Sequence, residues 1–99
     1  MIKEENKLRK KAEKIRANFE DKIVKLLAGM GKVVTSRGKT TTYLLKNNVI
    51  FGTIIDNEVH LIDTSSNQYE IVKDEILEDK DAFLMQATKS YFHVKNSKP

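Results

Sequence analysis

The sequence predicts an α+β fold in which a long N-terminal helix and a C-terminal helix cover one face of an antiparallel sheet. Apolar residues recur every three or four positions over residues 6–28 and again over residues 83–94, which is the spacing of amphipathic helices. Between them, residues 32–63 hold β-branched and aromatic runs separated by polar pairs, as in a meander of hairpins. Both helical stripes are best buried in one core on one side of a four- to five-stranded sheet.

The bulk composition indicates one small domain. The chain has 99 residues, of which 39% are hydrophobic and 32% charged, so a single small core is expected. There is no cysteine, which excludes disulfides and thiolate ligands and favours a reducing cytoplasm. The longest apolar stretch, residues 49–55, is far shorter than the ~20 residues that span a bilayer, and the charged N-terminus lacks a signal sequence. A cytoplasmic protein is therefore expected.

The N-terminal helix is predicted to end at Gly29 and Gly31, because glycine closes helices without steric cost. An alternative is that Asn18, followed by Asp21, caps a second helix. The expected organisation is a basic helical arm or extension over residues 1–17, one α+β domain over residues 18–94 and a frayed tail over residues 95–99. The apolar stripe comprises Leu8, Ala12, Ile15, Phe19, Ile23, Leu26, Leu27 and Met30.

The sheet is predicted from its turns. Asn and Asp tolerate positive φ, so Asn47-Asn48 and Asp56-Asn57 are good two-residue hairpin turns, and Gly38-Lys39 joins the first pair of strands. Asp79 or Asp74 is expected to cap the final helix. The predicted strands are residues 32–37, 40–46, 49–55 and 58–63, with residues 68–72 as a fifth strand or edge segment.

No catalytic or metal-binding pattern is recognisable. Gly38-Lys39-Thr40 copies the end of a phosphate-binding loop, but Val33 replaces its leading glycine and the segment predicts strand-turn-strand. His60 and His93 have no acidic or histidine neighbour at ligand spacing on a shared helix face. The serines lack the context of a nucleophile elbow. The sequence therefore predicts a non-enzymatic protein without cofactor or metal.

Charge is segmented along the chain. Residues 30–55 hold four bases and no acid, whereas residues 56–81 hold nine acids and two lysines. Such runs are most often solvated helix faces or helix starts, but each is also a candidate contact surface. The candidate basic surface comprises Lys7, Lys10, Lys11, Lys14, Arg16, Arg37 and Lys39. The candidate acidic surface comprises Asp74, Glu75, Glu78, Asp79 and Asp81.

Three segments carry a family resemblance: residues 19–33 (FEDKIVKLLAGMGKV), 51–61 (FGTIIDNEVHL) and 69–84 (YEIVKDEILEDKDAFL). From Phe19 to Tyr91 the chain resembles the N-terminal domain of the TfoX (Sxy) competence regulators. The family's Met-Phe-Gly-Gly-like stretch is replaced here by residues 37–40 (RGKT). The resemblance implies a regulatory module that acts through protein contacts, and it assigns no role to individual residues.

Three functions remain open from the sequence. The favoured one is a non-enzymatic regulatory binding module with a protein partner. The first alternative is a small antagonist from a mobile element, directed against restriction or CRISPR defence, that blocks a nucleic-acid-handling complex. The second is weak, sequence-independent nucleic-acid binding by the basic surface, which lacks aromatic residues for base stacking. A second copy of the chain is a further candidate partner, through the long N-terminal helix.

Overall fold

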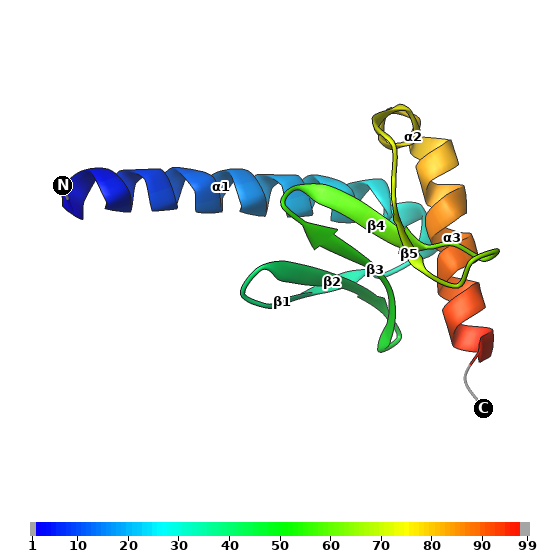
Figure 1. Ribbon diagram of the computed structural model, residues 1–99. Coiled ribbons are helices and arrows are strands. Elements are labelled where there is room, and N and C mark those ends of the chain that lie inside the picture. The colour runs from blue at the N-terminus through cyan, green and yellow to red at the C-terminus, as the bar shows by residue number, and fades with distance from the viewer. Residues whose placement is uncertain (1, 98–99) are drawn as a thin grey trace.

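The computed structural model describes the backbone of residues 2–97 and the side chains of residues 10–97. It confirms the predicted α+β fold, with an N-terminal helix, a five-stranded antiparallel sheet and a C-terminal helix (Figure 1). The elements are α1 (Ile2–Leu26), a 3₁₀ turn (Ala28–Met30), β1 (Val34–Arg37), β2 (Thr41–Lys46), β3 (Val49–Ile55), β4 (Glu58–Ile62), β5 (Tyr69–Ile71), α2 (Asp74–Glu78) and α3 (Lys80–Ser97).

The sheet is a simple meander in the order β1-β2-β3-β4-β5, and every neighbouring pair is antiparallel. The two predicted turns are confirmed, because Asn47, Asn48, Asp56 and Asn57 all have φ between 50° and 65°. Asparagine and aspartate tolerate this left-handed conformation better than most residues. The fifth strand is present as β5. The first strand is shorter than predicted, since its pairing with β2 begins only at Val34.

A β-bulge interrupts the alternation of inward- and outward-facing side chains along β3. Leu44 pairs with Gly52 whereas the next residue, Leu45, pairs with Ile50, so Phe51 is an extra residue in β3. Phe51 and Gly52 are consequently both buried. A Cβ atom on Gly52 would lie 2.8 Å from Leu61 Cδ2 and 3.0 Å from the His60 carbonyl oxygen, so the close packing of β3 on β4 requires glycine here.

The N-terminal helix is continuous. α1 passes Asn18 without a break, so the alternative of a second helix starting there is not observed. The helix ends at Leu26, earlier than expected, and a 3₁₀ turn leads to Gly31, whose φ of 109° favours glycine. The exit turn predicted around the two glycines is therefore present.

The C-terminal region contains two helices instead of one. The Asp79 carboxylate accepts a hydrogen bond from the Ala82 backbone N–H at 3.2 Å and so caps α3, whereas Asp74 is the first residue of the short α2 and not its cap. α3 continues to Ser97, whose hydroxyl donates to the His93 carbonyl at 2.6 Å. Residues 95–97, expected as part of a frayed tail, are therefore helical, and residues 98–99 lie outside the described part of the chain.

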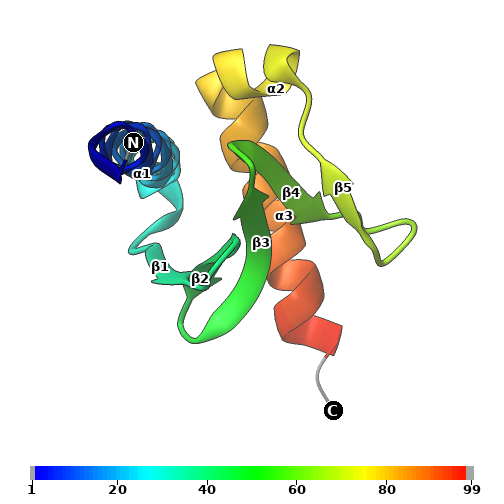
Figure 2. The ribbon, with the colours of Figure 1, turned by 60° about the vertical axis from the view of Figure 1, so that its left-hand side comes forward.

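Both long helices pack on the same face of the sheet, as predicted (Figure 2). Phe51 and Tyr91 meet edge to face with ring centroids 6.2 Å apart, which joins the sheet to α3. No helix in residues 2–97 combines the length and the apolar character that crossing a membrane requires. The core comprises Ile23, Leu27, Met30, Val33, Leu44, Val49, Phe51, Ile54, Val59, Leu61, Val72, Phe83, Ala87 and Tyr91.

Replacing Phe83, whose exposed fraction is 0%, with alanine should lower the free energy of unfolding by about 3–5 kcal/mol, because a large core cavity is created. Met85 lies two residues further along α3 and is 58% exposed, so Met85→Ala should change the free energy of unfolding by less than about 0.5 kcal/mol. Chemical denaturation of both variants measures the difference. Equal losses would contradict the packing of α3 on the sheet.

Candidate functional site

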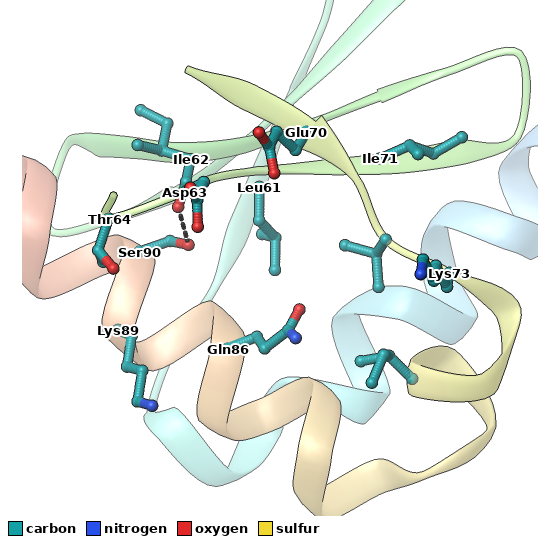
Figure 3. Close-up of a pocket in the computed structure, with 12 residues that line it drawn as sticks. Leu61, Ile62, Asp63, Thr64, Glu70, Ile71, Lys73, Gln86, Lys89 and Ser90 are labelled. Atoms are coloured by element: carbon teal, nitrogen blue, oxygen red, sulfur yellow. Dashed lines mark hydrogen bonds between the residues drawn. The ribbon is translucent and has the colours of Figure 1, made fainter. Parts of the chain in front are cut away.

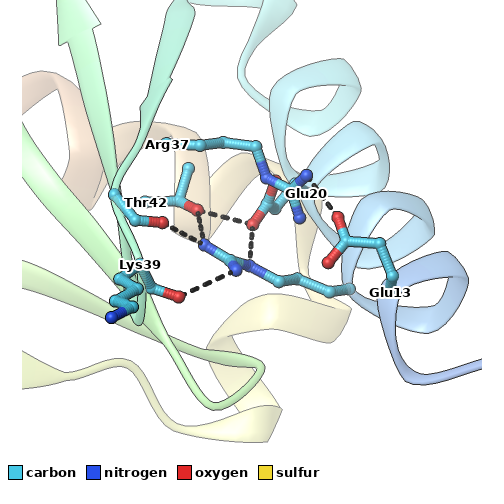
Figure 4. A network of polar contacts seen from close by, with 7 residues as sticks. Glu13, Glu20, Arg37, Lys39 and Thr42 are labelled. Carbon is cyan, nitrogen blue, oxygen red and sulfur yellow. Dashed lines mark hydrogen bonds and ion pairs between the residues drawn. The ribbon is translucent and has the colours of Figure 1, made fainter. Parts of the chain in front are cut away.

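Two members of the candidate basic surface are engaged within the fold (Figure 4). The Arg16 guanidinium on α1 donates to the Glu20 carboxylate at 3.1 Å, to the Thr42 hydroxyl at 3.0 Å and to the Gly38 carbonyl at 3.1 Å. It also donates to the carbonyl of Lys39 at 3.3 Å. Arg16 therefore fastens α1 to the β1–β2 hairpin.

Glu20 is the centre of this network. Its exposed fraction is only 6%, and a buried carboxylate needs compensation by cations and hydrogen bonds. Arg37 Nε lies 3.0 Å from Glu20 Oε1, while the Thr42 hydroxyl donates to Glu20 Oε2 at 2.6 Å. Arg37 also pairs with Glu13, and this hydrogen bond is the main cause that raises the pKa of Arg37 above its ordinary value. Both guanidinium groups are thus neutralised locally.

The remaining basic candidates stay on the surface. Lys10, Lys11 and Lys14 are exposed on α1, and Lys39 is exposed in the β1–β2 turn, although its carbonyl receives Arg16. The side chain of Lys7 lies outside the described side chains. The predicted basic surface is therefore reduced to separate lysines, because its two arginines have a structural role.

The candidate acidic residues lie together around α2 and the start of α3. Asp74, Glu75, Glu78, Asp79 and Asp81 are all exposed. The first two lie in the first turn of α2, where the helix dipole favours carboxylates. Asp79 has the capping role described above. This cluster is thus largely explained as helix-start chemistry, and its exposed carboxylates leave a negative surface at this end of α3.

The residues considered for catalysis or ligand binding have ordinary structural positions. Gly38-Lys39-Thr40 lies between two strands, as predicted, and not before a helix. His93 Nε2 lies 2.9 Å from Asn67 Oδ1, and the buried Ser90 hydroxyl donates to the Ile62 carbonyl at 2.6 Å. Among residues 10–97 no group of three or more His, Cys, Asp or Glu side chains could hold a metal ion.

The strongest candidate site is the face of the sheet opposite the helices, which we call the open face. The register places Tyr43 of β2, Thr53 of β3, His60 of β4 and Ile71 of β5 in one row across it. No described helix covers this side (Figure 2). Large apolar side chains are exposed there by 38–50%, namely Val34, Tyr43, Ile50, Tyr69 and Ile71.

The open face is almost free of charge. Among its paired positions Glu58, at the end of β4, is the only charged residue, whereas Arg37 and Lys46 point to the helix side. Its centre is tightly packed, since Thr53 is 6% exposed and His60 Nδ1 is buried without a hydrogen-bond partner among the described residues. An antiparallel sheet usually presents polar residues on a wet face. This face is therefore unusual in being both uncovered and apolar.

Two tyrosines span the open face. Tyr43 and Tyr69 come from β2 and β5, which are three strand spacings apart. Burial, and after it the charge on Tyr43, raise the pKa of the Tyr69 phenol above its usual 10.0. Their strands are about 14 Å apart across a flat sheet, so burial is the larger cause and the charge on Tyr43 the smaller one.

Sequence reasoning did not identify the open face, although a signal was present. β3 carries apolar residues at 49, 50, 51, 54 and 55, so both of its sides are apolar. A near-continuous apolar strand is typical of a sheet buried on both faces. Because the two predicted helices cover only one face, the apolar residues on the other side of β3 could have predicted an exposed apolar face.

No protein-family model matches this chain, and no curated protein matches it either. The resemblance to the TfoX N-terminal domain therefore stays a prediction.

Replacing Glu20 with alanine should lower the free energy of unfolding by about 2–3 kcal/mol. The reason is that the guanidinium groups of Arg16 and Arg37 both lose the Glu20 carboxylate with which they pair. Asp21 is the matched control, since its 64% exposed side chain pairs with Lys25 alone among the described side chains. Asp21→Ala should cost less than about 0.5 kcal/mol. Denaturant titration of both variants makes the comparison, and similar midpoints would rule out the network as an anchor of α1.

Tyr43→Phe should lower the pKa of Tyr69, because the variant removes the charge of the neighbouring phenolate. The fall should be partial, since burial is the larger cause of the raised pKa. Following the ring resonances of labelled tyrosine by NMR during an alkaline titration resolves the individual residues. An unchanged titration of Tyr69 would contradict an effect of the Tyr43 charge on it.

Proposed function

We propose that this chain is a non-enzymatic regulatory module that binds a protein partner through the open face. One observation carries the proposal: large, exposed apolar side chains gather on the one side of the sheet that no described helix covers. Contiguous apolar patches of this kind on soluble proteins commonly mark interaction sites. Tyrosine and isoleucine provide contact area with little loss of side-chain entropy, which suits them to such contacts.

The size of the face favours a reversible contact. Four strand spacings of about 4.8 Å give a width of about 19 Å, and seven residues of β3 extend over about 23 Å. The flat, projected area is at most about 400 Å², because β1 and β5 are shorter than β3. A contact confined to it belongs to the small end of protein interfaces, whose standard size is about 800 Å² of accessible surface per partner. A transient complex of moderate affinity suits a regulatory role better than a permanent assembly does.

The chemistry of the face favours protein over nucleic acid. Binding to a phosphate backbone requires lysine or arginine beside the contact, and no paired position on the open face carries either. The exposed lysines of α1 lie elsewhere, and Arg16 and Arg37 are neutralised by carboxylates. Nucleic-acid binding is thus the weaker alternative. The antagonist function, with the acidic cluster against a basic partner, is retained as the second candidate because those carboxylates are exposed.

The test compares surface variants of tagged full-length protein in lysate of the native host, with nuclease present. A face variant combines Tyr43→Glu and Ile71→Glu, and a lysine variant combines Lys10→Glu, Lys11→Glu and Lys14→Glu. We expect one protein to be recovered with the wild type and the lysine variant but lost with the face variant. After purification, calorimetry should show at least about tenfold weaker binding by the face variant.

The controls separate the alternatives. All variants must keep the circular dichroism and unfolding midpoint of the wild type, as expected for exposed positions. A partner lost only with Glu75→Lys and Glu78→Lys would replace the proposal with the antagonist function. Recovery of nucleic acid alone, in the absence of nuclease and lost with the lysine variant, would refute protein binding.

A further inference from the structure

The edge strand β5 offers unused backbone hydrogen-bonding groups. On the β4 side, the Val72 N–H donates to the Val59 carbonyl at 2.7 Å, and the Gln68 carbonyl accepts from the Asp63 N–H at 2.9 Å. Hydrogen-bonded pairs alternate along an antiparallel ladder. The N–H and C=O groups of Tyr69 and Ile71 must therefore point away from β4, toward the free edge. Within residues 10–97 none of these four groups has a hydrogen-bond partner.

The opposite edge of the sheet differs from β5 in the position of its charged side chain. The β1 edge carries the Arg37 side chain, which pairs with Glu13 and Glu20 of α1. Charged side chains on an edge strand discourage pairing with a further strand. Each edge strand has one charged residue, but Arg37 holds an edge-facing position of β1, whereas Glu70 of β5 faces β4. The two edge-facing residues of β5, Tyr69 and Ile71, are uncharged. The two edges are thus chemically different.

A groove opens directly beside β5 (Figure 3). It has a volume of about 460 Å³ and lies between the β4–β5 hairpin and α3. Leu61, Val72 and Ile76 supply apolar surface, and Gln86 projects into it from α3. The Gln86 amide makes no hydrogen bond within the described residues. The volume is within the range of about 300–1,000 Å³ that is typical of ligand sites, and is large enough for one or two side chains.

The charges of the groove indicate the chemistry of its occupant. The groove is lined by two acidic residues, Asp63 and Glu70, and two basic residues, Lys73 and Lys89, so its net charge is about zero. A strongly charged ligand would therefore gain no net electrostatic attraction there. Ile71 lines the groove and also belongs to the open face. A chain running along β5 would therefore direct alternate side chains into the groove and onto the edge of the open face.

We propose that an extended segment of the partner protein adds to β5 as a sixth strand, with alternate apolar side chains seated in the groove. This inference rests on the proposed function and specifies how the partner is held. The segment is uncharged or of low net charge, lacks proline, and pairs its backbone with the free groups of Tyr69 and Ile71. Strand addition draws affinity from main-chain hydrogen bonds and specificity from pockets for alternate side chains.

The probe is a library of linear peptides displayed on phage and selected against the full chain. Selected peptides should show apolar residues at alternate positions without proline. Ile71→Pro removes one edge-facing N–H, a change that edge strands tolerate, while Ile71→Ala keeps the N–H and removes the side chain. Fluorescence anisotropy with a synthetic selected peptide should show about tenfold weaker binding by Ile71→Pro than by Ile71→Ala.

Two further measurements are independent of the folding of the proline variant. Gln86→Trp should fill the groove and weaken peptide binding about tenfold, whereas Gln86→Ala should leave it within about twofold. Methylation of peptide amides should abolish binding at one alternate set of positions and leave it intact at the other.

A selection that yields no binding peptide would overturn the added strand, as would peptides insensitive to Ile71→Pro, Gln86→Trp and amide methylation. If such peptides, or the purified partner, still lost affinity with the face variant, the open face would stand without the sixth strand. If the face variant also bound unchanged, the proposed function would fail with it.

Discussion

The helices of this protein cover only one of the two faces of its sheet. This constraint determines where apolar surface stays exposed to water. α3 and the C-terminal part of α1 bring apolar side chains to the side that holds Leu44, Ile54 and Val59, whereas Ala12 and Ile15 of the predicted α1 stripe are exposed. The strands, however, carry large apolar residues on both sides. An apolar face that no helix covers remains in contact with water at a cost of about 25 cal/mol for each Å². A partner that buries this surface recovers that free energy, so the same imbalance that limits the fold provides the driving force for association.

The Glu20 network shows a second use of polar chemistry within this core. A carboxylate with 6% exposure is destabilising by itself, yet Arg16 and Arg37 compensate it and connect α1 to the β1–β2 hairpin. Hydrogen bonds from Arg16 to main-chain carbonyls of the hairpin turn restrict the position of the helix further. The N-terminal part of α1 extends beyond the sheet in Figure 1. Its direction is therefore set by polar contacts at one end of the sheet together with apolar packing at the other.

Much of the fold could be predicted because its signals are local. The asparagine and aspartate turns define the hairpins, and the apolar stripes define the helices within a few residues. The bulge at Phe51 and the division between α2 and α3 could not be predicted in this way, since a bulge depends on the register of two strands and the division depends on the capping by Asp79. The candidate basic surface was affected most. Arg16 and Thr42 are 26 residues apart, and Arg16 and Glu20 lie on neighbouring turns of one helix. Only the three-dimensional structure therefore shows that the charge of Arg16 is paired within the fold and is not available to a partner.

The groove beside β5 has the same origin as the open face. α3 packs against β3 and β4, and β5 has only three residues, so the last strand of the meander lacks both a helix beneath it and a neighbour at its edge. At the other end of the sheet, β1 is also an exposed edge strand, but its Arg37 side chain is held by Glu13 and Glu20 of α1. A partner segment paired with β5 and seated in the groove would supply the missing neighbour, and its alternate side chains would continue onto the open face. Backbone pairing and apolar burial would then act on one partner at adjoining surfaces, which explains how a face of modest area can bind selectively.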